Sequence, residues 1–151
     1  EPAEKSTMQQ PPRTPDAPVL DRPARIHVSW VGFLIAALTL GLGFYFFRIQ
    51  NAPDKWQTII FAALGFSQIG HALGLRAAGQ SPLSLKSNPS MTILALVTFL
   101  LQLAVIYIPW LDRFFELTPL SAAELGLAGV GGILTFAGVW LEKRITSHRG
   151  I

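Results

Sequence analysis

Four long apolar stretches, separated by polar segments, dominate the chain. They cover residues 30–47, 56–75, 91–110 and about 122–141. The first contains no Asp, Glu, Lys or Arg, and Thr39 is its only clearly polar side chain. Each stretch is close to the ~20 residues that an α-helix needs to cross ~30 Å of hydrocarbon. The pattern therefore predicts four membrane-spanning helices and disfavours a soluble bundle of unusually hydrophobic helices.

The segments around the apolar stretches complete the predicted architecture. Residues 1–29 are polar and rich in proline, which predicts an extended lead-in rather than a helix. The links within residues 30–147 are short, so consecutive spans are expected to be antiparallel neighbours, and residues 148–151 form a tail. The predicted fold class is an all-α membrane protein, with four antiparallel transmembrane helices forming a bundle, preceded by an extended Pro-rich cytoplasmic segment.

Lysine and arginine are distributed unequally between the two sides that this arrangement creates. The N-terminal segment, the link between the second and third spans, and the C-terminal end carry nine of these residues, whereas the two other links carry three. The positive-inside rule places the side that is richer in cations in the cytoplasm. The expected location is therefore the plasma membrane of a bacterium, as an integral multi-pass protein with both termini cytoplasmic.

Composition offers few candidates for chemistry. The chain has 14% charged residues and no cysteine, which removes disulfides and thiolate metal sites. Its net charge of +3 needs no nucleic-acid partner, because most of the cations flank the spans. The glycines near residue 130 lack the Lys and Ser or Thr of a phosphate loop, and no Ser–His–Asp arrangement is visible. His27 and His148 lie outside the spans and are expected to be solvated or interfacial. Because His71 is isolated in sequence from the other histidines, no metal cluster can be drawn from them.

Local signals predict where helices start and where they approach one another closely. Asn88 with Pro89 indicates the start of the third span, and Ser121 with Glu124 forms a capping box before the fourth. Small residues let membrane helices pack closely. Those expected to do so are Gly41, Gly43, Ala122, Gly126, Ala128 and Gly132.

Polar side chains inside the predicted spans have two interpretations. Ser67 and Gln68 lie four and three residues before His71, so the three are expected to share one broad face of the second span; Gln102 lies in the third. An unsatisfied buried polar group costs about 1–3 kcal/mol, so this face should point into the bundle. One interpretation is hydrogen bonding between helices, typically worth only ~0.6 kcal/mol. The other is an ion pathway, and the residues alone leave both open.

Several segments resemble one family of membrane proteins, in the same order along the chain. "EPAEKSTMQQPPRTP" (1–15) is similar to the cytoplasmic stretch after the sixth transmembrane helix of P-type cation-transporting ATPases, in their calcium-pump-like branch. "SQIGHALGLRA" (67–77) resembles the family's eighth helix, "SNP" (87–89) the start of its ninth, and "LLQLAVIYIPWLDRFFELTPLS" (100–121) the ninth helix and its exit loop. The resemblance covers essentially the whole chain and implies that the four spans are helices seven to ten of a ten-helix pump.

The resemblance also implies what this chain contributes to a pump. The Asp-Lys-Thr-Gly-Thr phosphorylation motif is absent, so no catalytic residue is expected here. ATP and Mg²⁺ are expected on the N-terminal part of the pump, which would be this chain's partner. Counted from Ala72 and Leu73, Gln68 falls where reticulum-type calcium pumps place a cation-binding Glu. An amide offers an oxygen but no charge. Gln68 is thus the candidate metal ligand and Ca²⁺ the candidate ion, whereas His71 is expected to pack.

Two other functions are compatible with the sequence. The chain could be an independent four-helix membrane protein, such as a small channel or an accessory subunit without a link to an ATPase. Alternatively, it could be a packing module of a pump, in which the polar residues only hold helices together. The chain begins with Glu1 rather than Met, so we expect a processed protein or part of a longer one.

Overall fold

A computed structural model of the chain describes residues 21–77 and 89–148. These residues form helices and no strand, which confirms the all-α prediction. Four helices are long and apolar enough to span a membrane. The first of these spans, Arg22–Ile49, includes the helix α1 and the short π-helix η2 that follows it. The elements are α1 (Arg22–Phe44), η2 (Tyr45–Ile49), α2 (Trp56–Ala77), α3 (Pro89–Tyr107), α4 (Pro109–Phe114) and α5 (Ala122–His148).

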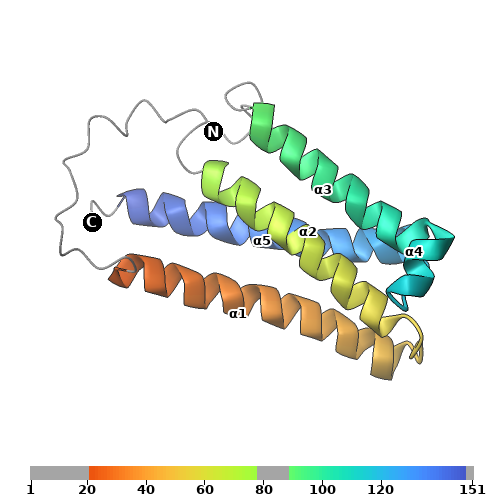
Figure 1. The fold of residues 1–151 in the computed structure, drawn as a ribbon. Helices are drawn as coiled ribbons and strands as arrows, with labels where there is room; N and C mark the ends of the chain where they lie inside the picture. Colours follow the sequence, from red (N-terminus) through yellow and green to blue (C-terminus); the bar gives the residue numbers. More distant parts are fainter. Residues whose placement is uncertain (1–20, 78–88, 149–151) are drawn as a thin grey trace.

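The four long helices alternate in direction, as predicted (Figure 1). The helices α1 and α3 run one way, and α2 and α5 run back. One end of the bundle carries α4 and the links beside it, and we call it the α4 end. We call the other the His27 end, because α1 begins there, close to His27, and α2 and α5 finish there.

The first helix begins earlier than predicted. Residues 22–29 were assigned above to the extended lead-in, but they form the first turns of α1, so that assignment is wrong for them. Asp21 caps the helix, since its Oδ1 accepts a hydrogen bond of 2.9 Å from the backbone N–H of Ala24. Pro23 fits the first turn because the N–H groups there have no partner within the helix. Residues 1–20 of the lead-in lie outside the described residues.

The third span ends earlier than predicted. It was expected to continue to residue 110, but α3 ends at Tyr107 and a separate short helix, α4, begins at Pro109. Ile108 lies between them in an extended conformation, with φ −85° and ψ 119°. Proline sterically disfavours the helical conformation in the residue before it, and it also lacks an N–H to donate. Pro109 therefore ends one helix and starts the next.

The other predicted helix starts agree with the structure. The Ser121–Glu124 capping box is formed: the Ser121 N–H donates to Glu124 Oε2 at 2.7 Å, and the Glu124 N–H donates to Ser121 Oγ at 3.3 Å. Pro89 is the first residue of α3, whereas Asn88 lies outside the described residues. The last helix continues to His148, beyond the predicted end of the span at residue 141.

The most extensive helix pair is α2 with α5, which we call the α2–α5 seam. Glycines bring the two backbones together. A Cβ on Gly132 would lie 2.6 Å from the carbonyl oxygen of Phe66, and one on Gly70 would overlap the Gly132 carbonyl. Ala128 is fully buried. The predicted close packing is thus confirmed for Ala128 and Gly132.

The remaining small residues divide into two groups. Gly43 packs against the side chain of Ile60, as expected of a helix contact. In contrast, a Cβ on Gly41 or on Gly126 would meet nothing within 4 Å, and Ala122 is exposed. For these three the predicted contact is not made within the described part of the chain.

The two outer helices are attached differently to the seam. The helix α1 packs against both α2 and α5, whereas α3 comes close to α2 alone among the long helices described. Figure 1 shows α3 on the side of α2 that is away from α1, separating from α5 toward the His27 end. The bundle is therefore three packed helices with a fourth attached to one side.

Candidate functional site

The polar residues predicted to share one face of α2 lie on different faces. Ser67 is fully buried. Its Oγ has no hydrogen-bond partner, and a Cβ placed on Gly131 of α5 would lie 3.5 Å from that oxygen. The next residue, Gln68, is exposed. Successive residues of a helix are about 100° apart, because one turn takes ~3.6 residues, so burying Ser67 in the seam turns Gln68 outward.

Gln68 lies on a face of α2 that no other described helix covers. The exposed residues Gln57, Leu64, Gln68 and Leu75 follow one another along this face, which we call the open face of α2. Gln68 is ~18 Å along the helix from Trp56, and therefore near the middle of the span. Within the described residues its amide makes no hydrogen bond. Gln68 therefore does not point into the bundle that the described helices form.

Gln102 supports the hydrogen-bonding interpretation of the polar residues. It is one of the few buried side chains of α3, with 8% exposure. Its Nε2 donates to the carbonyl oxygen of Phe61 on α2 at 3.0 Å. The amide fits because Gly65 has no side chain: a Cβ there would overlap the oxygen of the Gln102 amide. Gln102 is thus a contact between α3 and α2.

The sequence predicted only that His71 packs, whereas the structure places it against a second histidine. Its Nε2 lies 3.4 Å from Nε2 of His27 on α1, and the two rings are stacked. On the other side of His27, Nδ1 lies 2.8 Å from Oε2 of Glu142 on α5. We call these three residues the histidine clasp. His27 was expected outside the spans, solvated or interfacial, but α1 starts early enough to bring it into contact with α2 and α5.

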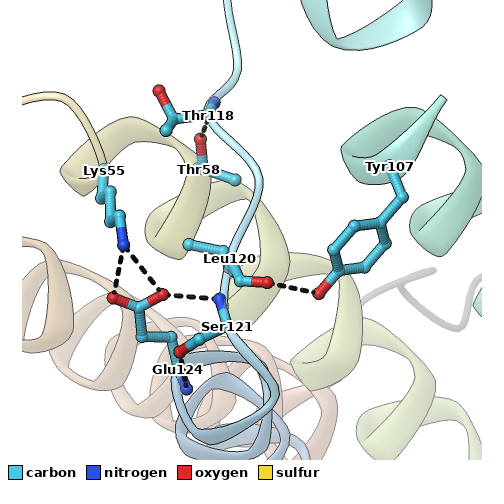
Figure 2. A network of polar contacts seen from close by, with 7 residues as sticks. All are labelled: Lys55, Thr58, Tyr107, Thr118, Leu120, Ser121 and Glu124. Atoms are coloured by element: carbon cyan, nitrogen blue, oxygen red, sulfur yellow. Dashed lines mark hydrogen bonds and ion pairs between the residues drawn. The ribbon is translucent and has the colours of Figure 1, made fainter. Parts of the chain in front are cut away.

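A second polar group joins the helices at the α4 end (Figure 2). Lys55 immediately precedes α2, and its Nζ lies 2.9 Å from Oε1 of Glu124 at the start of α5. Thr58 of α2 accepts a hydrogen bond of 2.8 Å from the N–H of Thr118. Tyr107, the last residue of α3, donates from its hydroxyl to the Leu120 carbonyl at 2.8 Å. This α4-end network fixes the link between α3 and α5 against α2.

The described residues differ in the polar groups that they place at the ends of the bundle and at membrane depth. They contain no group of three or more His, Asp or Glu side chains placed to hold a metal ion. Their buried polar groups are hydroxyls and one amide, and the titratable side chains cluster at the two ends of the bundle. At membrane depth the described residues present one unpartnered amide on an open helix face, that of Gln68.

Comparison with known proteins agrees with this arrangement. The family model described as "Cation transporting ATPase, C-terminus" matches residues 1–145. Comparison with curated proteins finds no match. The four apolar helices are what such a membrane region requires. The chain is therefore an integral membrane protein that belongs to the family of C-terminal regions of P-type cation-transporting ATPases, as the resemblance implied.

Proposed function

We propose that this chain is the membrane module that completes a calcium-transporting pump, and that Gln68 lends one oxygen to a cation site. The supporting observation is the unpartnered amide of Gln68 on the open face of α2. A polar group in the middle of a span needs a partner, because lipid offers none. In a pump of this family the partner surface is the rest of the membrane domain, with the transported ion between the two.

The chemistry of Gln68 suits a hard cation held by several oxygens. Ca²⁺ takes six to eight oxygen ligands, and amide carbonyls are among them. The Gln68 amide supplies such an oxygen without a negative charge, so the charged ligands must come from the other helices of the pump. The same division assigns ATP and Mg²⁺ to the N-terminal part of the pump.

The module also has a mechanical role in this proposal. The α2–α5 seam holds α2 by backbone contact at Gly70 and Gly132, so α2 can keep Gln68 in place while helices on the other side of the ion move. The distribution of lysine and arginine supports an orientation in which the His27 end faces the cytoplasm and the α4 end faces outward. The expected membrane is the bacterial plasma membrane.

The test uses the whole pump that carries this segment, purified in nanodiscs, with ATP hydrolysis measured against free Ca²⁺. Gln68→Ala is expected to raise the Ca²⁺ concentration for half-maximal activity about tenfold, the equivalent of ~1.4 kcal/mol. Gln68→Glu restores a carboxylate and is expected to lower that concentration. Gln57→Ala is the matched control, because it removes the same amide from the same open face, close to the α4 end.

Each result separates one function from another. Unchanged Ca²⁺ dependence in Gln68→Ala would reject the ligand role and leave a packing module. Hydrolysis that responds to another cation but not to Ca²⁺ would reject calcium as the ion. ATPase activity in the purified chain without any partner would contradict its assignment as a non-catalytic module.

A further inference from the structure

The histidine clasp joins three helices through two imidazoles and a carboxylate. His27 belongs to α1, His71 to α2 and Glu142 to α5. His27 and Glu142 keep 17% and 25% of their side chains exposed, so protons can reach them from solvent. Because the clasp lies at one end of the bundle, it is a contact that the surrounding solution can change.

The geometry limits how many protons the closed clasp can hold. The two Nε2 atoms face each other at 3.4 Å, so only one hydrogen fits between them. The Nδ1 of His27 carries a second hydrogen, which it donates to the Glu142 carboxylate. If both imidazoles were fully protonated, two N–H groups and two positive charges would face each other. The closed pair therefore carries at most one positive charge.

Other charges at this end do not relieve that repulsion. Two basic side chains, Arg22 on α1 and Lys143 on α5, line the same hollow as His27 and Glu142. The last turn of α2 adds Arg76, so cations outnumber the carboxylates here. The charged or titratable groups around the clasp, beyond its own members, are Asp21, Arg22, Arg76 and Lys143.

The apolar packing of α1 sets how far a change at the clasp can spread. Val31 and Ile35 of α1 are buried against Val139 of α5, starting one turn beyond His27. Further along, Gly43 is packed against Ile60. Separation of the charges would therefore release the turns of α1 before Val31 and leave the rest of the bundle assembled.

We propose that the histidine clasp is a proton-responsive contact between α1 and the α2–α5 seam. It is closed when His27 and His71 share one excess proton or none, and it opens when each imidazole carries a proton of its own. The open form binds more protons than the closed form, so a falling pH favours opening. Free imidazoles titrate at about pH 6.5, so a test must compare pH values on both sides of it. The proposal does not depend on which cation the pump moves.

The test measures the distance between the ends of α1 and α2 in the chain reconstituted in nanodiscs. The chain has no cysteine, so Val28→Cys and Leu75→Cys give two unique and exposed sites for spin labels. Between pH 7.5 and pH 5.5 the distance distribution is expected to shift to larger values. A second label pair, at Ile49 and Gln57, lies at the α4 end and is expected to stay unchanged.

Two histidine variants identify the groups responsible. His71→Gln keeps a hydrogen-bonding side chain but cannot take up a proton, so its distance should not change with pH. His148→Gln removes the third histidine of the chain and should behave as the parent does. As a second measurement, lowering the pH from 7.5 to 5.5 should decrease the thermal unfolding midpoint of the parent by about 2–4 °C more than that of His71→Gln.

Three results would overturn the proposal. The first is a Val28–Leu75 distance that is the same at both pH values in the parent chain. The second is an equal shift in His71→Gln, which would assign the response to other groups. The third is loss of the shift in His148→Gln. If His71→Gln does not fold, His27→Gln takes its place, with the same expected loss of the response.

Discussion

The helix α2 is joined to α5 and to α3 in two different ways. Against α5 it makes backbone contact along the α2–α5 seam, at positions where only glycine fits. Against α3 it makes a side-chain hydrogen bond from Gln102 and an aromatic contact between Phe66 and Phe99, whose ring centroids are 5.7 Å apart. Burial differs accordingly. Of the most apolar 18 residues in each helix, 44% are buried within the structure in α2 and 11% in α3.

The difference follows from how helices associate in lipid. Lipid tails are as apolar as leucine, so an apolar helix surface gains little from facing another helix rather than lipid. Stability between helices then comes from close van der Waals packing or from hydrogen bonds. The seam uses the first and α3 uses the second. The seam therefore determines the fold of this module, while most of the α3 surface is available to lipid or to the rest of the pump.

The largest effect is expected from a substitution in the seam. Gly132→Val places a branched side chain where a Cβ alone would lie 2.6 Å from the Phe66 carbonyl. The helices must separate, and the expected loss is about 3 kcal/mol, at the upper end for overpacked sites. Unfolding is measured by titration with dodecyl sulfate and is monitored by tryptophan fluorescence.

The control for this prediction is Gly126→Val, on the same helix. A Cβ at Gly126 would meet nothing within 4 Å, so this variant changes intrinsic helix preference equally but does not crowd a neighbour. It should unfold close to the parent. If the two variants lost similar amounts of stability, the seam would not depend on close approach at Gly132.

The next effect concerns the α4 end of the seam. Glu124→Ala removes both the capping-box acceptor for the Ser121 N–H and the ion pair with Lys55. The two losses together are expected to lower the free energy of unfolding by about 1–2 kcal/mol. Glu124→Gln can still accept from the Ser121 N–H, so it should lose less than half as much in the same titration. Equal losses would assign the whole effect to the charge.

A smaller effect is expected where α3 meets α2. Gln102→Leu keeps the volume but removes the donor to the Phe61 carbonyl, at a cost of about 0.6–1.7 kcal/mol. The loss should appear as faster hydrogen exchange in α3, without a matching change in α5. Leu101→Ala is the control, because Leu101 is 60% exposed and faces away from α2. Equal exchange in α5 would mean that α3 and the seam unfold together.

Much of the fold could be predicted from local features of the sequence. The apolar stretches identified all four spans because length and hydropathy suffice when the solvent is lipid. The Ser121–Glu124 capping box was predictable because both partners lie within one turn. The errors at residues 22–29 and at Pro109 share a cause. The effect of a proline depends on its position in the turn, which its presence in a polar or apolar run does not reveal.

The candidate site was less predictable because its geometry is long-range. Ser67 and Gln68 were expected to face the same way, but the rotation of α2 is set by Gly70 and Gly132 in the seam. The sequence offered no measure of which glycines would be in contact. The meeting of His27 with His71 required the true start of α1 as well as the relative positions of two helices. Neither can be obtained from periodicity within one span.

The smallest effect is expected from a single hydroxyl at the end of α3. Tyr107→Phe removes the hydrogen bond to the Leu120 carbonyl, an interaction expected to contribute ~0.6 kcal/mol. Tyr45→Phe, which alters the only other tyrosine of the chain, removes an exposed hydrogen bond with Gln50 near η2 and is the matched control. Exchange of the last amides of α3 should accelerate about threefold in Tyr107→Phe alone, since ~0.6 kcal/mol is close to RT. If both variants accelerated the exchange of these amides equally, Tyr107 would not hold the end of α3 in place. Gln102 would then be the main polar contact between α3 and the bundle.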